Sequence, residues 1–284
     1  MRFQLGFITS LLLFSKSLFA QADSVQIVQS GWNKSKLAGG VHLFQKNFKG
    51  SLFKSNQYVS IVEVKTRKRN KFKLAYERQL LRHTSDFGES SKATAAINGS
   101  FFDVKNGGSV DYIKANDSII SGNRLEKDST RARHQKAAII IDHNRLDIAK
   151  WDGSAEWEQG LKASNILLSG PLLIYHDSLT LADTSAFARL RHPRTAIAKK
   201  GNKTYLITVD GRNDNAAGMS LYELEKFLKW FGANNAINLD GGGSTTLWVN
   251  ARKQKGIVNH PSDNKKWDHE GERKVANAIL LIRN

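Results

Sequence analysis

The sequence predicts a single domain of the α+β or mixed α/β class, in which a few helices pack on a mixed β-sheet. Short β-type runs recur along the chain, and polar turns separate them. Few stretches show the three- and four-residue hydrophobic spacing of a helix. With 284 residues, 40% of them hydrophobic, the chain can bury a large core, and this composition excludes wholesale disorder.

The predicted strands are short runs rich in apolar and β-branched residues. They cover residues 58–64, 72–76, 94–97, 137–141, 166–175, 195–198, 204–209, 236–239, 245–249 and 275–282. Turns such as residues 199–203 give them hairpin spacing. No internal repeat and no Pro- or Ser-rich linker divides the chain, so residues 23–284 are expected to form one domain.

One helix is clearly indicated after residue 220. Ser220 and Glu223 have the spacing of a capping box, in which each side chain satisfies a free backbone donor. Leu221, Leu224, Phe227, Leu228 and Phe231 then share one face, and Gly232 ends the helix. A further helix is predicted at residues 184–190, and residues 73–82 fit either a helix or a strand.

The first 22 residues have the features of a secretory signal peptide. Arg2 precedes an apolar stretch at residues 5–14, and Ala20-Gln21-Ala22 has the small-x-small pattern that signal peptidase recognises. The stretch is shorter than the about 20 residues that span a bilayer. We therefore expect an exported protein, periplasmic or secreted, with no stable membrane insertion after cleavage. An uncleaved anchor is the alternative.

The charge of the chain favours anionic partners. It has 43 Lys and Arg against 26 Asp and Glu, a formal charge of +17, and a solvated basic surface is the alternative explanation. The densest basic run, residues 65–71, lacks interleaved aromatic residues, so we expect a solvated hairpin loop and no nucleic-acid partner. The chain has no cysteine, which excludes disulfides, thiol nucleophiles and Cys-bound zinc.

The most informative segment is a triple-glycine turn between two apolar runs. Its glycines permit close backbone approach and can point several amides into one concavity that favours an anion. Hydroxyl donors follow the glycines, and a carboxylate precedes them. The candidate residues are Asp240, Gly241, Gly242, Gly243, Ser244 and Thr245. The alternative is a tight hairpin turn.

Polar residues at the ends of other predicted strands form further candidate segments. Arg212 follows the turn at Asp210 and could contact phosphate in a bidentate manner. Asn277 is a polar residue within an apolar strand and needs a hydrogen-bond partner or a function. The remaining candidates are Asn98, Gly99, Ser100, Arg194, Thr195 and Asn259. Taken singly, these segments are also explained as turns or surface charge.

Taken together, these segments resemble the phosphodiester glycosidase family. The matching pieces occur in the order of the family: AAINGSFFD at 95–103, SGPLL at 169–173, HPRTAIA at 192–198, DGR at 210–212 with GMSLYELEKFL at 218–228, AINLDGGGSTTL at 236–247, and VNHPS at 258–262 with VANAIL at 275–280. The resemblance is strongest over residues 94–284. Ser100 and Ala198 stand where the family often has Gly, and Ser100 bears on substrate identity more than on fold.

The resemblance implies a hydrolase that releases a sugar from a sugar-1-phosphodiester. With the predicted signal peptide and the positive charge, we expect an exported enzyme that acts on an anionic envelope or extracellular glycan. The leaving phosphate monoester has a second pKa near ~6 and needs little protonation, so stabilising its charge matters more. Arg194, Arg212 and residues 241–245 are candidates for that role. Asp240 and Asp210 are candidates for activating water or attacking the anomeric carbon, and Asn98 and Asn277 for orienting sugar hydroxyls or the carboxylates.

Two other functions fit parts of the sequence. A noncatalytic envelope protein could bind anionic glycans through its basic surface. A metal-dependent phosphodiesterase could use Asp103, Asp210 and Asp240 as ligands of a hard cation. No compact carboxylate and histidine spacing requires a metal, so we expect neither metal nor cofactor.

Overall fold

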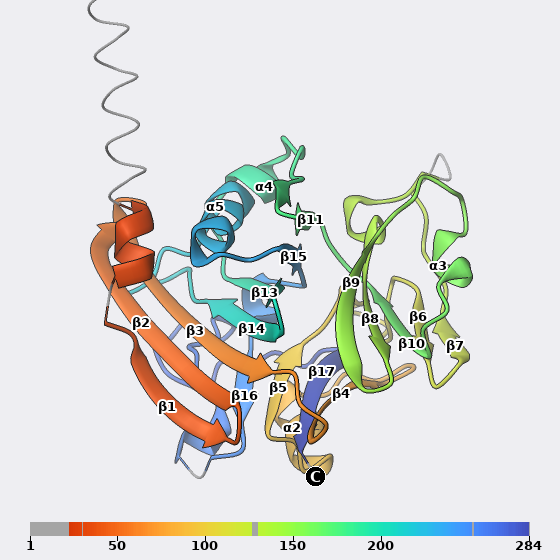
Figure 1. Ribbon diagram of the computed structural model, residues 1–284, viewed down its shortest axis with the longest axis horizontal. Helices are drawn as coiled ribbons and strands as arrows, with labels where there is room; N and C mark the ends of the chain where they lie inside the picture. Colours follow the sequence, from red (N-terminus) through yellow and green to blue (C-terminus); the bar gives the residue numbers. More distant parts are fainter. Residues whose placement is uncertain (1–22, 30, 127–129, 252, 284) are drawn as a thin grey trace, which may run out of the picture.

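Three antiparallel β-sheets make up most of the molecule, and short helices lie around them (Figure 1). The computed structural model describes residues 23–29, 31–126, 130–251 and 253–283, so the predicted signal peptide lies outside the described residues. Among the described residues, no helix has the length and apolar character needed to cross a bilayer.

The largest sheet has eight strands, in the order β1-β2-β3-β14-β13-β15-β11-β12. Their bounds are Asn33–Ala38, Val41–Leu52, Ser55–Lys65, Lys203–Val209, Arg194–Lys200, Asn235–Asn238, Leu172–Tyr175 and Ser178–Leu179. Figure 1 shows β2 and β3 at one side of this sheet, with α5 (Leu221–Phe231) and α4 (Ala186–Arg189) beyond β13 and β14.

Two smaller sheets complete the fold. The five-stranded sheet has the order β7 (Ser118–Ser121), β6 (Ile113–Ala115), β10 (Asn165–Leu168), β8 (Ala137–Asp142) and β9 (Arg145–Lys150). The four-stranded sheet has the order β16 (Leu247–Val249), β5 (Ala95–Asn98), β17 (Asn277–Arg283) and β4 (Asn70–Tyr76). Short helices α2 (Thr84–Ser90) and α3 (Trp157–Gly160) and three 3₁₀ turns (Arg133–Gln135, Gly242–Ser244 and Lys253–Gly256) lie in the connections.

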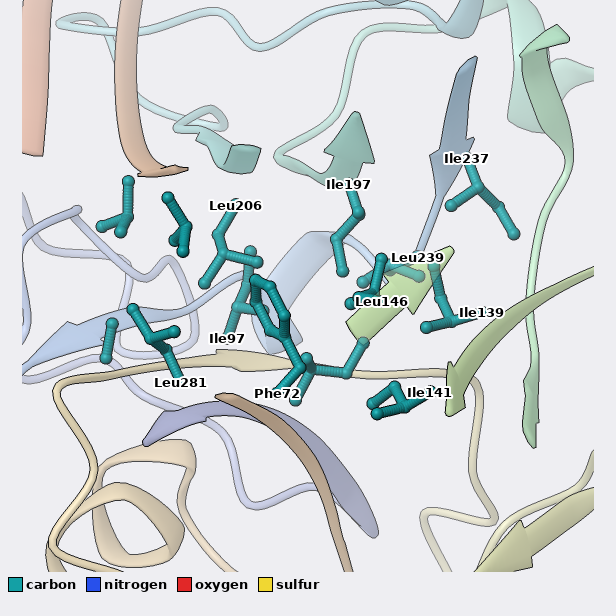
Figure 2. Packing of buried hydrophobic residues seen from close by; sticks show 14 of the residues in the cluster. Phe72, Ile97, Ile139, Ile141, Leu146, Ile197, Leu206, Ile237, Leu239 and Leu281 are labelled. Atoms are coloured by element: carbon teal, nitrogen blue, oxygen red, sulfur yellow. The ribbon is translucent and has the colours of Figure 1, made fainter. Parts of the chain in front are cut away.

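One hydrophobic cluster joins the three sheets, and Figure 2 shows its centre. Ile197 and Leu206 come from the eight-stranded sheet, Ile139 from the five-stranded sheet, and Ile97 and Leu281 from the four-stranded sheet. Because apolar burial stabilises by about 25 cal/mol per Å², this shared core fixes the sheets against one another. The polar ends of the same strands are thereby held in fixed positions.

The helix after residue 220 is confirmed. Ser220 Oγ accepts from the amide of Glu223 at 3.1 Å, and the Glu223 carboxylate accepts from the amide of Ser220 at 2.9 Å. Gly232 ends the helix with φ 90°, in the left-handed region that glycine tolerates best. Leu224, Phe227 and Leu228 are buried against the eight-stranded sheet.

Several predicted elements differ in the structure. The run at residues 166–175 divides at the cis bond between Gly170 and Pro171, so β10 and β11 belong to different sheets. Residues 73–82 contain the end of β4 and no helix. The basic run at 65–71 connects strands of different sheets and is therefore not a hairpin loop. Residues 245–246 precede β16 instead of extending it.

The predicted α+β class is correct in its coarser form, because the molecule is dominated by sheet with a few short helices. The expected mixed sheet differs in detail: all ladder pairings between the described strands are antiparallel. Antiparallel pairing has a direct consequence for function. It places the first residue of one strand beside the last residue of its neighbour.

Candidate active site

The predicted site residues lie at strand ends that meet. Arg194 begins β13 opposite the last residue of β14, and Ala196 pairs with Asn238 at the end of β15. In the four-stranded sheet, Ala278 near the start of β17 pairs with Asn98 at the end of β5. Asp210 follows β14 and Asp240 follows β15, so the topology gathers all these segments at one end of the strands.

Asn98 connects two of the sheets at this point. Its Nδ2 donates to the carbonyl of Asp240 at 2.7 Å, and its Oδ1 accepts from Thr195 Oγ1 at 2.9 Å. The amide of Thr246 also donates to Oδ1, at 3.0 Å. Asn98 and Thr195 are buried. Their polar groups therefore hold the glycine turn in place instead of facing open space.

Asn277 fixes the turn after β5 in a similar way. Its Oδ1 accepts from the amide of Ser100 at 2.7 Å, and its Nδ2 lies 3.4 Å from Ser100 Oγ. A Cβ on Gly99 would lie 2.0 Å from Asn277 Oδ1, which explains the glycine at this position. Asn277 thus has the partner that a buried polar residue requires.

The backbone itself uses part of the triple-glycine turn. The amide of Gly242 donates to the carbonyl of Pro193 at 2.9 Å, and the amides of Ser244 and Thr245 close 3₁₀ bonds to Gly241 and Gly242. The expectation that successive amides from 241 to 245 all face an anion is therefore wrong for these three. Among the described residues, the amides of Gly241 and Gly243 have no backbone acceptor.

The hydroxyls of this turn are buried but lack direct partners among the described residues. Thr245 Oγ1 and Thr246 Oγ1 are in this group, and Ser244 Oγ has no partner within hydrogen-bond geometry but lies close enough to the Asp240 carboxylate to lower its pKa. Buried hydroxyls are normally hydrogen-bonded, so unpaired ones next to a strand end indicate a place for a polar guest or for water. This observation favours the predicted role of Ser244 and Thr245.

Asp240 is the partly exposed carboxylate of the site. Burial raises its pKa to about 6, and the effects of Ser244, Arg273, the Gly241 amide and His134 lower it only in part. Near neutral pH such a carboxyl group is mostly ionised, as a nucleophile must be, and its pKa is close enough to the operating pH for a general base.

Asp210 is held quite differently. It is 1% exposed, and its oxygens accept from Asn259 Nδ2 at 2.9 Å and from the amide of His260 at 2.9 Å. His260 Nδ1 lies 3.0 Å from the same carboxylate. Asn259 also donates to the carbonyl of Thr245 at 3.0 Å. Asp210 and Asn259 therefore connect the end of β14 to the segment that follows the glycine turn.

Arg194 and Arg212 were both expected to contact phosphate, but their environments differ. Arg194 is 1% exposed, and its Nε donates to the carbonyl of Met219 at 2.8 Å. Its Nη2 donates to the carbonyls of Phe187 at 2.7 Å and Leu190 at 3.0 Å. Burial, followed by the charge of Arg212, lowers its pKa to about 10. These contacts give Arg194 a structural role.

Arg212 is exposed, with φ 62°, and its guanidinium lies over Gly242. A Cβ at Gly242 would come within 3.0 Å of Arg212 Nη2, so this glycine permits the approach. Among the described residues, Arg212 has neither an ion pair nor a hydrogen-bond acceptor for its side chain. Its charge is therefore available to an anion beside the turn.

The structure adds residues that sequence reasoning did not single out. His134 acts electrostatically on Asp240, lies 3.3 Å from the buried Asp111, and contacts the Phe101 ring at 4.6 Å. His134 stands in a basic segment just before β8, which resembles the segment before β13; that signal could have found it. On the Asp210 side, the rings of His260 and Trp267 stack at 3.8 Å.

The three carboxylates considered for a metal do not form a metal cluster. Asp103 accepts from Arg124 at 2.7 Å in a turn, and this bond, with those from Asn106, holds its pKa well below the usual range. Among the described residues, no group of three or more His, Cys, Asp or Glu side chains is arranged to bind a metal. The geometry thus gives no support to the metal-dependent alternative.

Comparisons with known proteins agree with the family resemblance of the ordered sequence segments. The model of the phosphodiester glycosidase family matches residues 91–282. Bovine N-acetylglucosamine-1-phosphodiester alpha-N-acetylglucosaminidase is 31% identical over 193 residues, which are 61% of this chain and 33% of the bovine protein. An uncharacterised SPbeta prophage-derived protein of Bacillus subtilis is 36% identical over 81 residues, 28% of this chain and 12% of that protein. The chain spans about a third or less of the length of these relatives.

Solved structures share the fold. The catalytic domain of zebrafish N-acetylglucosamine-1-phosphodiester alpha-N-acetylglucosaminidase, auto-inhibited by its pro-peptide, matches with a TM-score of 0.65 at 20% identity. That match covers 89% of this chain and 88% of the zebrafish chain. A hypothetical protein from Synechocystis also matches with a TM-score of 0.65, at 16% identity, over 89% of this chain and 64% of that chain.

Proposed function

The chain belongs to the phosphodiester glycosidase family, and from this premise we propose that it hydrolyses the bond between a sugar and phosphate in a sugar-1-phosphodiester. Asp240 carries the proposal, because this partly exposed carboxylate with a pKa of about 6 lies beside a turn that an unpaired arginine covers. A carboxylate that acts as base or nucleophile and a cation that stabilises the departing phosphate suit this reaction.

In the proposed reaction, the bond between the anomeric carbon and the phosphate oxygen breaks, and the phosphate monoester leaves with the bonding electrons. The oxygen of water ends on the sugar. Where Asp240 activates this water, it takes the proton and passes it to solvent; where Asp240 first forms a glycosyl ester, water hydrolyses that ester, frees the carboxylate and releases its proton to solvent. The Asp240 carboxylate either activates this water or first attacks the anomeric carbon. Both roles require the ionised form. Arg212 stabilises the negative charge that develops on the departing phosphate.

Several predicted residues receive a positioning role in this proposal. Asp210 and Asn259 connect β14 to the glycine turn, Asn98 holds the backbone of Asp240, and Asn277 holds the turn at Ser100. We also propose that the protein is exported, because residues 1–22 have the pattern of a signal peptide. Its substrates would then be anionic glycans of the envelope or the extracellular space.

The decisive experiment identifies the bond that breaks. N-acetylglucosamine-1-phosphate methyl ester and related sugar-1-phosphodiesters are hydrolysed in water labelled with heavy oxygen, and the products are analysed by mass spectrometry. We expect the label in the free sugar. Label in the phosphate would identify a phosphodiesterase that cuts the phosphorus–oxygen bond instead. Salt-sensitive binding without turnover across the panel would identify a noncatalytic glycan-binding protein.

Arg212→Ala is expected to lower kcat/KM for such a substrate by about 10²- to 10³-fold, the usual effect of removing a donor to developing charge. Because the side chain is exposed, the melting temperature should change little. Arg212→Lys should recover part of the activity, since lysine keeps the charge but not the planar fork. The matched control is Arg69→Ala in the exposed basic run at 65–71. Equal losses in both variants would show that only overall charge matters.

A further inference from the structure

A groove adjoins the candidate active site and is not explained by the reaction at Asp240. Its volume is about 860 Å³, within the range of about 300–1,000 Å³ typical of ligand sites. Its lining includes Arg133, Lys136, Lys150, Trp151, Pro171 and Tyr175. The lining also includes Glu126 and Asp183, and Asp183 pairs with Arg133 at 2.5 Å, so Lys136 and Lys150 are the basic groups of the groove without a carboxylate partner among the described residues.

One end of the groove lies near segments that hold the site. Arg133 lines the groove, and the next residue, His134, acts on Asp240. Pro171 also lines it, and its carbonyl accepts from the amide of Asn238 at 3.0 Å, just before Asp240 in the chain. The Phe187 ring packs against both Arg133, at 5.3 Å, and Arg194, at 4.9 Å. These contacts place the groove on the side of the site where His134 and Phe187 lie.

The other end of the groove opens into a second hollow. This hollow has a volume of about 600 Å³ and shares Lys150 and Tyr175 with the groove. Beyond them it is lined by residues that include Lys199 and His176. Together the two hollows form a path longer than a single sugar unit requires, which is the shape expected for binding a chain.

A lysine lies over one face of the Trp151 ring and another over one face of the Tyr175 ring, and the His176 ring packs against Tyr175 at 4.2 Å between centroids. Lys136 Nζ lies 5.3 Å from the Trp151 ring, and Lys150 Nζ lies 6.0 Å from the Tyr175 ring. The Trp151 indole donates to the carbonyl of Ser154 at 2.7 Å, which fixes the orientation of the ring. Neither lysine is in an ion pair with a carboxylate among the described residues, whereas Lys199 in the second hollow pairs with Asp147 at 2.8 Å. Rings suit the C–H faces of sugars, and free ammonium groups suit phosphates.

From this alternation we propose that the groove binds the phosphate-linked sugar units next to the unit that is cleaved, so the substrate is an anionic glycan chain and not an isolated sugar phosphodiester. The proposal rests on the function proposed above. A neutral oligosaccharide would use the rings alone, and an anionic protein surface would use the lysines alone. A phosphate-linked glycan uses both at their observed spacing.

Binding is measured by calorimetry with the full chain carrying Asp240→Asn, so that no substrate is consumed. The probes are single-unit and four-unit oligomers of N-acetylglucosamine-1-phosphate, with chitotetraose as the neutral oligomer of the same length. The four-unit phosphate oligomer is expected to bind about tenfold or more tightly than the single unit, as for one additional set of favourable contacts. Trp151→Ala, and separately Lys136→Gln with Lys150→Gln, should remove this advantage.

Lys68→Gln with Lys73→Gln is the matched control, because it makes the same charge change at exposed positions away from the groove. The inference is overturned if the control removes the advantage equally, if both groove variants keep it, or if chitotetraose gains as much. Circular dichroism checks that each variant is folded. Hydrolysis of single units without any length advantage leaves the proposed function standing and ends this inference. A length advantage that the groove variants remove, in a protein that hydrolyses none of the substrates, supports the groove as a binding site and contradicts the proposed function.

Discussion

Replacing Asp240 by asparagine is expected to reduce hydrolysis of a sugar-1-phosphodiester by about a thousandfold or more, because the ionised carboxylate is lost while the shape is kept. The wild-type protein should show the same requirement in its pH dependence. Since burial raises the pKa of Asp240 to about 6, kcat/KM should rise about tenfold per pH unit below 6 and level off above it.

The effect on stability separates catalysis from folding. A pKa above the unfolded value means that the folded protein disfavours the ionised carboxyl group, so its contribution to stability falls as pH rises toward about 6. Asp240→Asn should therefore raise the free energy of unfolding by up to about 2 kcal/mol more at pH 8 than at pH 4. Urea denaturation at both values measures this difference.

Asp103→Asn is the matched control, since Asp103 lies in a turn with Arg124 and has no place in the proposed reaction. It should retain activity, and chelators should have no effect on the wild type. Activity that declines as the pH rises past 6 would contradict the assigned role, because Asp240 would then act as a proton donor. Loss of activity in Asp103→Asn and on chelation would restore the metal-dependent alternative.

Local patterns predicted most of the strands that carry the site and the helix α5. The capping pair Ser220 and Glu223 was sufficient to predict the start of α5, because its contacts span only three residues. Apolar runs predicted β13, β14 and β17. The prediction of one strand at residues 166–175 was wrong, because nothing in the hydrophobic periodicity shows that Gly170 and Pro171 redirect the chain into another sheet. Strand identity is local, whereas sheet membership depends on distant partners.

The same limit applies to the functional side chains. Arg194 and Arg212 look equivalent in the sequence, but the donors of Arg194 reach carbonyls at Phe187, Leu190 and Met219. Asp210 and Asp240 each follow a strand, yet only Asp210 meets Asn259 and His260, about 50 residues away in the chain. Whether a polar group is satisfied is a tertiary property, so sequence could nominate these residues but not separate their roles.

Arg194→Met is expected to lower the free energy of unfolding by about 3 kcal/mol or more. The buried guanidinium donates to the carbonyl of Met219 in a buried bond and to those of Phe187 and Leu190 in partly buried bonds, and a buried acceptor that loses its donor costs about 1–3 kcal/mol. Methionine fills part of the same volume, so the loss reflects hydrogen bonds more than a cavity. The midpoint of urea denaturation measures it, with Arg212→Ala expected to shift that midpoint little.

The pair of variants decides which arginine meets the phosphate. If Arg194 organises the carbonyls around β13, Arg194→Met should lose stability first, and activity should fall in proportion to the fraction that is unfolded. If Arg194 instead contacts substrate, the variant should keep its denaturation midpoint and show a reduced kcat. In that case the two charges would act on the leaving group together. The double variant Arg212→Ala with Arg194→Met should then raise the activation free energy by less than the sum of the increases in the two single variants.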